Sequence, residues 1–133
     1  MQLVISGSRY LNDYELLNKT LLRVTFRWDW KKLKLHLGDN KGDKVKQTAG
    51  ADALAARWCS QWYIPYCRYR ADWTLGKKAG PLRNREMLDG AGPGARVLCF
   101  HDGRTDGCGT WDMIQEAKRR GLDLKIIKVK IDG

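Results

Sequence analysis

The chain lacks the features that mark membrane or secreted proteins. It has no run of about 18 apolar residues, the length that crosses a bilayer as a helix. Its first residues, MQLVISGSRY, contain neither the basic region nor the long apolar region of a signal peptide. The four cysteines form no CxxC pair and have no paired histidines, so no zinc or other metal site is expected. We therefore expect a cytoplasmic protein with reduced thiols and no membrane association.

Acidic residues are few relative to basic ones. The chain has 25 Lys and Arg against 15 Asp and Glu, a net charge of +10. This excess predicts an anionic partner, which could be a nucleotide, a nucleic acid or an acidic protein surface. Six Trp and five Tyr could pack the core or stack on bases. The length of 133 residues predicts a single domain, residues 1–133, with its own core.

Apolar runs and helical patterns alternate along the chain. This order predicts an α/β fold: a Rossmann-like, three-layer arrangement with a mainly parallel sheet of about five strands. In the second strand, polar residues alternate with leucines, which predicts a half-exposed strand with His36 on the surface. The polar segment 40–47 is expected to be an exposed loop. We expect strands at 3–5, 33–37, 64–69, 96–100 and 124–131, and helices after Asp13 and at 49–62, 83–88 and 110–120.

Three glycine-containing segments follow strand-like runs or carry clustered cations. They are GSR at 7–9, GCGT at 107–110, and the basic segment 71–87, which is expected to be a loop up to its Arg-Asn-Arg helix start. Backbone N–H groups at helix starts, together with Lys and Arg side chains, are typical of phosphate sites. We expect these segments to lie together at the carboxyl edge of the sheet.

Several motifs give the chain a resemblance to a known family. GSR, GAD at 50–52, ADW at 71–73, GKKAGPLRN at 76–84 and GT at 109–110 occur in that order. Together they resemble the YspA-related branch of the SLOG superfamily, the Rossmann-like group named for the Smf/DprA and "Lonely Guy" proteins. The resemblance covers nearly the whole chain and implies a doubly wound fold that binds nucleotides or nucleotide-derived ligands. It also suggests a part in phage or bacterial defence or counter-defence.

The resemblance and the residue chemistry together predict a ligand site. Arg9 and Arg83 would bind phosphate, and Trp73 could stack on a base or belong to the core. Asp39 and Asp52 could bind ribose hydroxyls or a Mg²⁺ ion carried with a nucleotide, and they are weak catalytic candidates; Asp52 could equally be a helix-terminal carboxylate. Thr110 could bind phosphate or simply cap its helix. The expected ligand-binding residues are Gly7, Ser8, Arg9, Gly38, Asp39, Gly50, Asp52, Trp73, Lys77, Gly80, Arg83, Asn84, Gly107, Gly109 and Thr110.

The chain departs from the family pattern in two places. Residues 40–49 lengthen a loop that is short in the family. The "Lonely Guy" hydrolases carry a PGGxGTxxE loop, and here the position of its Glu is occupied by Met113. Met113 cannot act as an acid or a base, so that hydrolase activity is not expected by simple transfer.

Four functions stay open from the sequence. The first is a protein that senses or sequesters a nucleotide-derived small molecule. The second is a nucleotide N-glycosidase or phosphohydrolase that uses Asp39 or Asp52. A third is a single-stranded nucleic-acid-binding module that uses Lys125, Lys128, Lys130 and the lysines of 41–46, and a fourth is an inhibitor that binds an acidic protein surface. A homo-oligomer is compatible with each of them.

Overall fold

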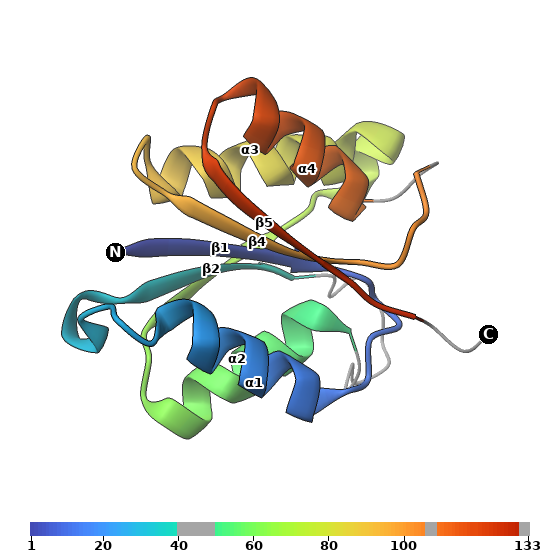
Figure 1. Ribbon diagram of the computed structural model, residues 1–133. Helices are drawn as coiled ribbons and strands as arrows, with labels where there is room; N and C mark the ends of the chain where they lie inside the picture. The colour runs from blue at the N-terminus through green and yellow to red at the C-terminus, as the bar shows by residue number, and fades with distance from the viewer. Residues whose placement is uncertain (40–49, 106–108, 131–133) are drawn as a thin grey trace.

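A computed structural model describes residues 1–39, 50–105 and 109–130 as a parallel sheet covered by helices on both faces (Figure 1). The strands are β1 (Gln2–Gly7), β2 (Lys34–Asp39), β3 (Tyr66–Arg70), β4 (Arg96–His101) and β5 (Asp123–Lys128). The helices are α1 (Tyr14–Thr25), α2 (Ala51–Trp62), α3 (Ala79–Ala91) and α4 (Gly109–Arg119), with short 3-10 turns η1 (Trp30–Lys32) and η2 (Trp73–Lys78).

The sheet has the strand order β3-β2-β1-β4-β5, and every pairing is parallel. Helices α1 and α2 lie on one face and α3 and α4 on the other (Figure 1). The predicted Rossmann-like α/β fold is therefore confirmed. The strand order reverses direction between β1 and β4, and such a switch point opens a crevice at the carboxyl ends of the strands.

Each face of the sheet buries its own apolar cluster. On the α1–α2 side, Trp58 and Phe100 are fully buried among leucines from α1, α2 and the central strands. On the α3–α4 side, Met87, Met113 and Ile114 pack against the central strands. These two clusters hold β1 and β4 rigidly from both sides, so the loops that leave their carboxyl ends start from fixed positions.

The expectation of a half-exposed second strand was wrong. Strand β2 lies inside the sheet, and the strands of a parallel sheet are covered on both faces. His36 is accordingly buried, with its two ring nitrogens 2.8 Å from the Tyr69 hydroxyl oxygen and 2.6 Å from Gln2 Oε1. Burial, and secondarily the charge of Lys34, lower the pKa of His36. It is a core histidine and does not belong to the surface.

The basic segment is more helical than expected. Lys77 and Lys78 end the 3-10 turn η2, and α3 begins at Ala79, four residues before the expected start. Pro81 fits in the first turn of α3, because its nitrogen lies where no intrahelical partner is needed. Gly76, with φ of 69°, makes a kink inside η2.

Glu116 has a buried carboxylate that pairs with arginines exposed to different extents at the end of α4. Its carboxylate accepts hydrogen bonds from Arg119 and Arg120, and the Arg119 bond is the main cause that lowers its pKa to about 2. The folded state therefore binds fewer protons than the unfolded chain between about pH 2 and 4.5. This stabilisation is complete above pH 4.5 and is lost as the pH falls toward 2.

We expect Glu116→Gln to lower the free energy of unfolding by about 1–2 kcal/mol at neutral pH, since its arginine partners are partly screened by water. The difference from the unsubstituted protein should shrink as acid is added, because Glu116 then becomes neutral. Denaturant unfolding at a series of pH values measures this, with Glu86→Gln on the exposed face of α3 as the control. A difference that does not change with pH would contradict the role given to the carboxylate.

None of the helices in residues 1–39, 50–105 and 109–130 is both long and apolar enough to span a membrane.

Candidate functional site

A cavity of about 820 Å³ lies at the carboxyl ends of β1 and β4, at the switch point of the sheet. It lies within the range of about 300–1,000 Å³ that is usual for ligand pockets. The lining brings together residues from the loop after β1 and from α2, η2, α3, the segment after β4, and α4. They are Ser6, Gly7, Ser8, Arg9, Tyr10, Asp52, Trp73, Lys77, Gly80, Pro81, Arg83, Arg104, Thr105, Gly109, Thr110, Trp111, Asp112 and Gln115.

Asp52 and Arg83 converge over Gly38, near the carboxyl end of β2. A Cβ atom at Gly38 would lie 2.7 Å from Asp52 Oδ2 and 2.9 Å from Arg83 Nη1, so only glycine leaves room for both groups. Asp52 also accepts a hydrogen bond from the Gly38 backbone N–H. Asp52 was interpreted either as a ligand residue or as a helix-terminal carboxylate; the structure shows it lining the cavity beside a guanidinium, in the first turn of α2.

The surroundings of Asp52 have opposing effects on its pKa. Burial is the largest cause and raises the pKa to about 6, and the negative charge of Asp39 acts in the same direction. The charges of Arg83 and Arg68 and the bond from Gly38 lower it, but by less. Asp52 therefore titrates near neutrality, in a position that faces the cavity.

Arg83 lies on α3, and its guanidinium reaches both Gly38 of β2 and the start of α4. Its side chain is 9% exposed, and Nη2 lies 3.8 Å from the position that a Cβ of Gly109 would occupy. The first backbone N–H groups of α4 have no partner within the helix, and the positive end of the helix dipole lies there. A guanidinium beside a helix N-terminus is an arrangement that favours oxyanions.

Asn84 holds the beginning of α4 in place. Its side-chain amide donates to the Gly109 carbonyl and to Asp112 Oδ2, both at 3.0 Å. Asn84 is 1% exposed and does not line the cavity. The amide therefore positions the helix start that faces the cavity.

The loop after β1 is fixed by hydrogen bonds to distant segments. The Ser8 N–H donates to the Phe100 carbonyl at 3.0 Å, and the Ser8 hydroxyl bonds to Asp102. The Gly50 and Ala51 N–H groups donate to the carbonyls of Leu11 and Ser8. Two of the N–H groups at the start of α2 are thus used by the protein itself and are not available to a ligand.

Asp102 and Arg104 form an ion pair at the rim. Arg104 Nη2 lies 2.9 Å from Asp102 Oδ2, and its guanidinium stacks over Tyr10, 4.8 Å from the ring centroid. The hydrogen bond from the Arg104 side chain is the main cause that lowers the pKa of Asp102 to about 2. Asp102 thus stays charged and keeps Arg104 along the cavity wall.

The aromatic residues divide between the core and the cavity. Trp30 packs edge-to-face against Trp58 and Trp62, away from the site. Trp73 is 47% exposed and lines the cavity, so the interpretation that placed it in the core is wrong. Trp111 lines the cavity from the first turn of α4, and its ring stacks on that of His101 with 5.7 Å between the ring centroids.

The predicted edge of the sheet is found, although not every predicted residue faces the cavity. Gly7 and Gly109 lie on the same edge, as expected. The predicted residues that line the cavity are Gly7, Ser8, Arg9, Asp52, Trp73, Lys77, Gly80, Arg83, Gly109 and Thr110. Gly38, Asp39, Gly50 and Asn84 lie behind or beside it, and Gly107 falls outside the described residues.

The structure changes the interpretation of Gly7 and of Thr110. Gly7 is required by packing, because a Cβ there would lie 2.5 Å from the Cβ of Ala51 and 2.9 Å from that of Phe100. Thr110 is the second residue of α4, so it does not cap that helix; its side chain is buried at the cavity wall. Both residues shape the cavity wall whether or not they touch a ligand.

Eight lining residues were not predicted: Ser6, Tyr10, Pro81, Arg104, Thr105, Trp111, Asp112 and Gln115. Tyr10 and Trp111 directly follow predicted ligand residues, so their positions in the sequence could have indicated them. Arg104 comes soon after β4 in a segment that carried no motif.

The charges at the site bear on metal binding and hydrolysis. Asp52 faces Arg83 and Arg68, an arrangement that favours an anion over a divalent cation. The described residues contain no group of three or more His, Cys, Asp or Glu side chains that could hold a metal ion. Met113 is buried in the α3–α4 core, and Asp112 is bound to Asn84.

Comparisons with protein-family models, with curated proteins and with solved structures found no match to this chain.

Proposed function

We propose that the protein binds a nucleotide or nucleotide-derived small molecule in the cavity at the carboxyl edge of the sheet. The observation that carries this proposal is the position of Arg83, a buried guanidinium between Asp52 and the start of α4. A phosphate at that point would receive hydrogen bonds from Arg83 and from free N–H groups of the helix. Lys77, Arg9 and Arg104 add positive charge around the opening.

The aromatic lining supports a ligand with a planar base. Trp73 and Trp111 enter the cavity from η2 and α4, and their faces offer stacking surfaces for a nucleobase. This combination of cations and indole rings matches the chemistry of a nucleotide better than that of an inorganic anion alone. The resemblance of the sequence to nucleotide-binding SLOG proteins points in the same direction.

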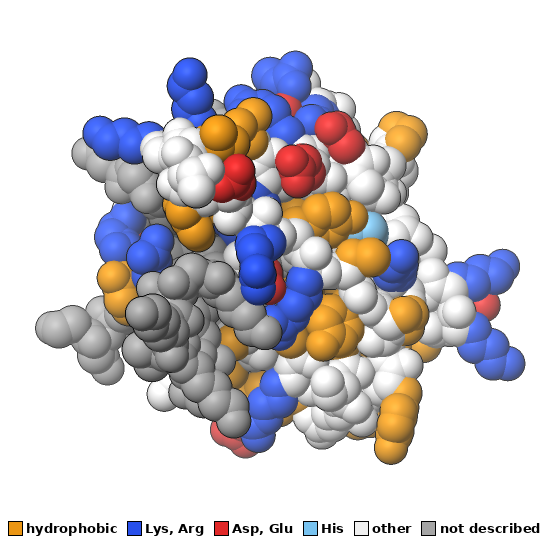
Figure 2. Space-filling view, turned by 180° about the vertical axis from the view of Figure 1, so that it is seen from behind, with side chains coloured by type: hydrophobic (Ala, Val, Ile, Leu, Met, Phe, Trp, Pro, Cys, Tyr) orange, Lys and Arg blue, Asp and Glu red, His pale blue; other side chains and the backbone are white. Residues whose placement is uncertain are grey.

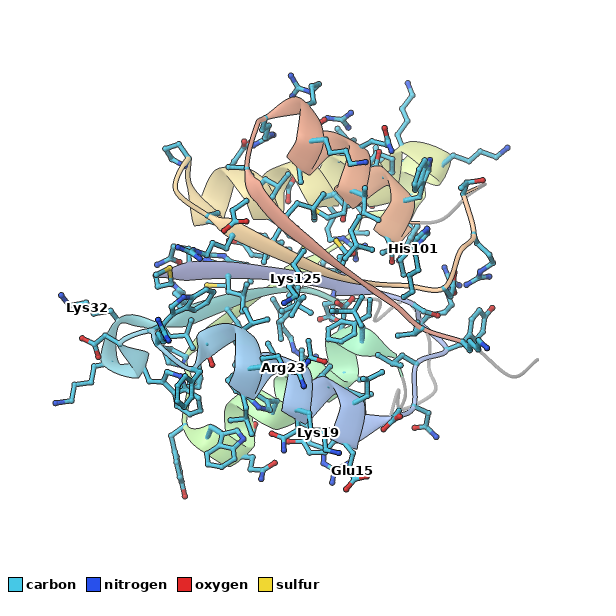
Figure 3. The ribbon with its side chains drawn as sticks, viewed as in Figure 1. Glu15, Lys19, Arg23, Lys32, His101 and Lys125 are labelled. Carbon is cyan, nitrogen blue, oxygen red and sulfur yellow. The ribbon has the colours of Figure 1, made fainter. Side chains whose placement is uncertain are left out.

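Nucleic-acid binding is a second proposal, and a separate surface favours it. Lys19 and Arg23 of α1 lie on the same side of the molecule as Lys125 of β5, while His101 marks the cavity end of the sheet (Figure 3). On the opposite side, Lys and Arg side chains lie among hydrophobic, uncharged and acidic ones (Figure 2). A phosphate backbone would therefore use the α1–β5 side.

A ligand panel distinguishes the two proposals. We expect mononucleotides, ADP-ribose or cyclic dinucleotides to raise Tm at millimolar concentration, with one ligand bound per chain. Binding of single-stranded nucleic acid would instead weaken by about 0.7 log units per log unit of salt for each phosphate neutralised. Failure of every small ligand to raise Tm would contradict the cavity proposal. A steep salt slope abolished by Lys19→Glu, Arg23→Glu and Lys125→Glu would favour the nucleic-acid proposal.

We expect binding without rapid turnover. Cleavage of an N-glycosidic bond needs an acid or base beside the leaving group. Among residues 1–39, 50–105 and 109–130, the lining carboxylates are Asp52 and Asp112. Both already have partners within the protein. The same panel, with and without Mg²⁺, is assayed for release of base or phosphate. Multiple turnovers that vanish in Asp52→Asn, with ligand binding retained, would instead make Asp52 catalytic.

A further inference from the structure

The charges around Asp52 balance before any ligand binds. Three charged groups face Asp52: Arg83 on α3, Arg68 on β3, and Asp39 at the end of β2. In the described part of the chain this group contains two cations and two carboxylates. An anion placed on Arg83 would bring a further negative charge next to the Asp52 carboxylate, in a partly buried space.

We propose that binding of an oxyanion to Arg83 is coupled to the uptake of one proton by Asp52. The inference rests on the proposed function and concerns its regulation. Solvent supplies the proton, no covalent bond to the ligand changes, and the neutral carboxyl group removes the repulsion between Asp52 and the bound anion. The site would then bind phosphate-type ligands more tightly in mildly acidic conditions than in mildly alkaline ones.

Geometry assigns the proton to Asp52. Its Oδ2 and the Arg83 Nη1 atom meet over one backbone position at Gly38, so an anion that engages this guanidinium lies close to the carboxylate. Like charges at short range in a partly buried space raise a carboxyl pKa. The pKa of Asp52 is already raised to about 6 by burial, so a neighbouring anion raises it further, through the neutral range.

The direction of the effect follows from linkage. Because the complex holds the proton more tightly than the free protein, affinity increases as the pH falls through the interval between the two pKa values. We expect the dissociation constant to be about tenfold lower at about pH 5.5 than at about pH 7.5, if the anion raises the pKa by between one and two units.

The experiment uses two probes that do not titrate in this interval, sulfate and the pyrophosphate diester ADP-ribose. Isothermal titration calorimetry is run at about pH 5.5, 6.5 and 7.5 in buffers of different ionisation enthalpy, which reports the number of protons taken up. We expect an uptake of about half a proton or more at pH 6.5. Asp52→Asn, which keeps the size of the side chain and imitates its neutral form, should abolish the uptake and bind at pH 7.5 about as tightly as the unsubstituted protein does at pH 5.5.

Asp39→Asn is the comparison variant: it removes a charge that raises the pKa of Asp52, so the uptake should persist and the pH dependence should move to lower pH. A pH dependence that survives in Asp52→Asn, or one that disappears only in Asp39→Asn, would overturn the assignment. Binding of ADP-ribose with no proton uptake would overturn the coupling and leave the proposed function standing. The absence of any binding by either probe at every pH would contradict the oxyanion site itself, and the coupling with it.

Discussion

Replacing Arg83 by alanine is expected to weaken binding of a phosphate-bearing ligand by roughly ten- to more than a hundredfold. The guanidinium is 9% exposed and lies between Asp52 and the start of α4. A charge-assisted hydrogen bond at such a position contributes about 1.5–3 kcal/mol. Calorimetric titration with the ligand that the panel identifies measures the loss.

Two further variants keep this result interpretable. Arg57→Ala removes the same charge from the exposed side of α2, where the guanidinium stacks on Tyr14, and should change affinity little. Arg83→Lys retains a cation but loses the forked geometry, so we expect it to recover only part of the affinity. Circular dichroism checks that each variant folds. Equal affinity in folded Arg83→Ala and in the unsubstituted protein would contradict the assignment of Arg83 as the phosphate contact.

The largest expected effect on stability is that of Gly7→Ala. The added methyl group would lie 2.5 Å from the Cβ of Ala51, 2.9 Å from that of Phe100 and 3.1 Å from the Phe100 carbonyl oxygen. These atoms belong to β4 and to the first turn of α2, which cannot move without disturbing the sheet. We expect a loss of about 2–3 kcal/mol and a decrease in Tm of roughly 6–12 °C.

Gly94→Ala is the matched control, since a Cβ there would meet no atom within 4 Å and the residue has no positive φ. Its stability should be unchanged or slightly higher. Thermal unfolding of both variants, followed by circular dichroism, measures the difference. A Gly7→Ala protein as stable as the Gly94→Ala protein would show that the helix–sheet contact adapts more easily than its distances indicate.

The sequence was sufficient to predict the layers of the fold. Each apolar run followed by a helical pattern became one strand–helix unit, and the glycine segments reached one edge because parallel strands all end on the same side. The buried position of His36 was not predictable from alternation alone. Whether a polar residue on a strand faces water depends on what covers that strand, which only the strand order decides.

Many residues of the candidate site could be predicted from the sequence, but the role of each residue could not. Asn84 and Ser8 were expected to contact a ligand, but the structure gives them partners in the protein: groups of α4 for Asn84, and groups of β4 and of the segment after it for Ser8. Those partners lie far away in the sequence, so no local pattern indicates them. The pairing of Asp52 with Arg83 likewise depends on the side-by-side placement of α2, β2 and α3.

The hydrogen bonds of the loop after β1 also decide when the site is formed during folding. The Ser8 N–H bonds to Phe100 on β4, and the Gly50 and Ala51 N–H groups bond back to Leu11 and Ser8. The Ser8 bond can close only when β1 and β4 have paired, and the Gly50 and Ala51 bonds only when the start of α2 has met the loop after β1, because each joins segments far apart in the sequence. We therefore expect the cavity to form late in folding. The amide protons of Gly50 and Ala51 should exchange with solvent through openings that separate α2 from that loop, and the Ser8 amide proton through openings that separate the loop from β4.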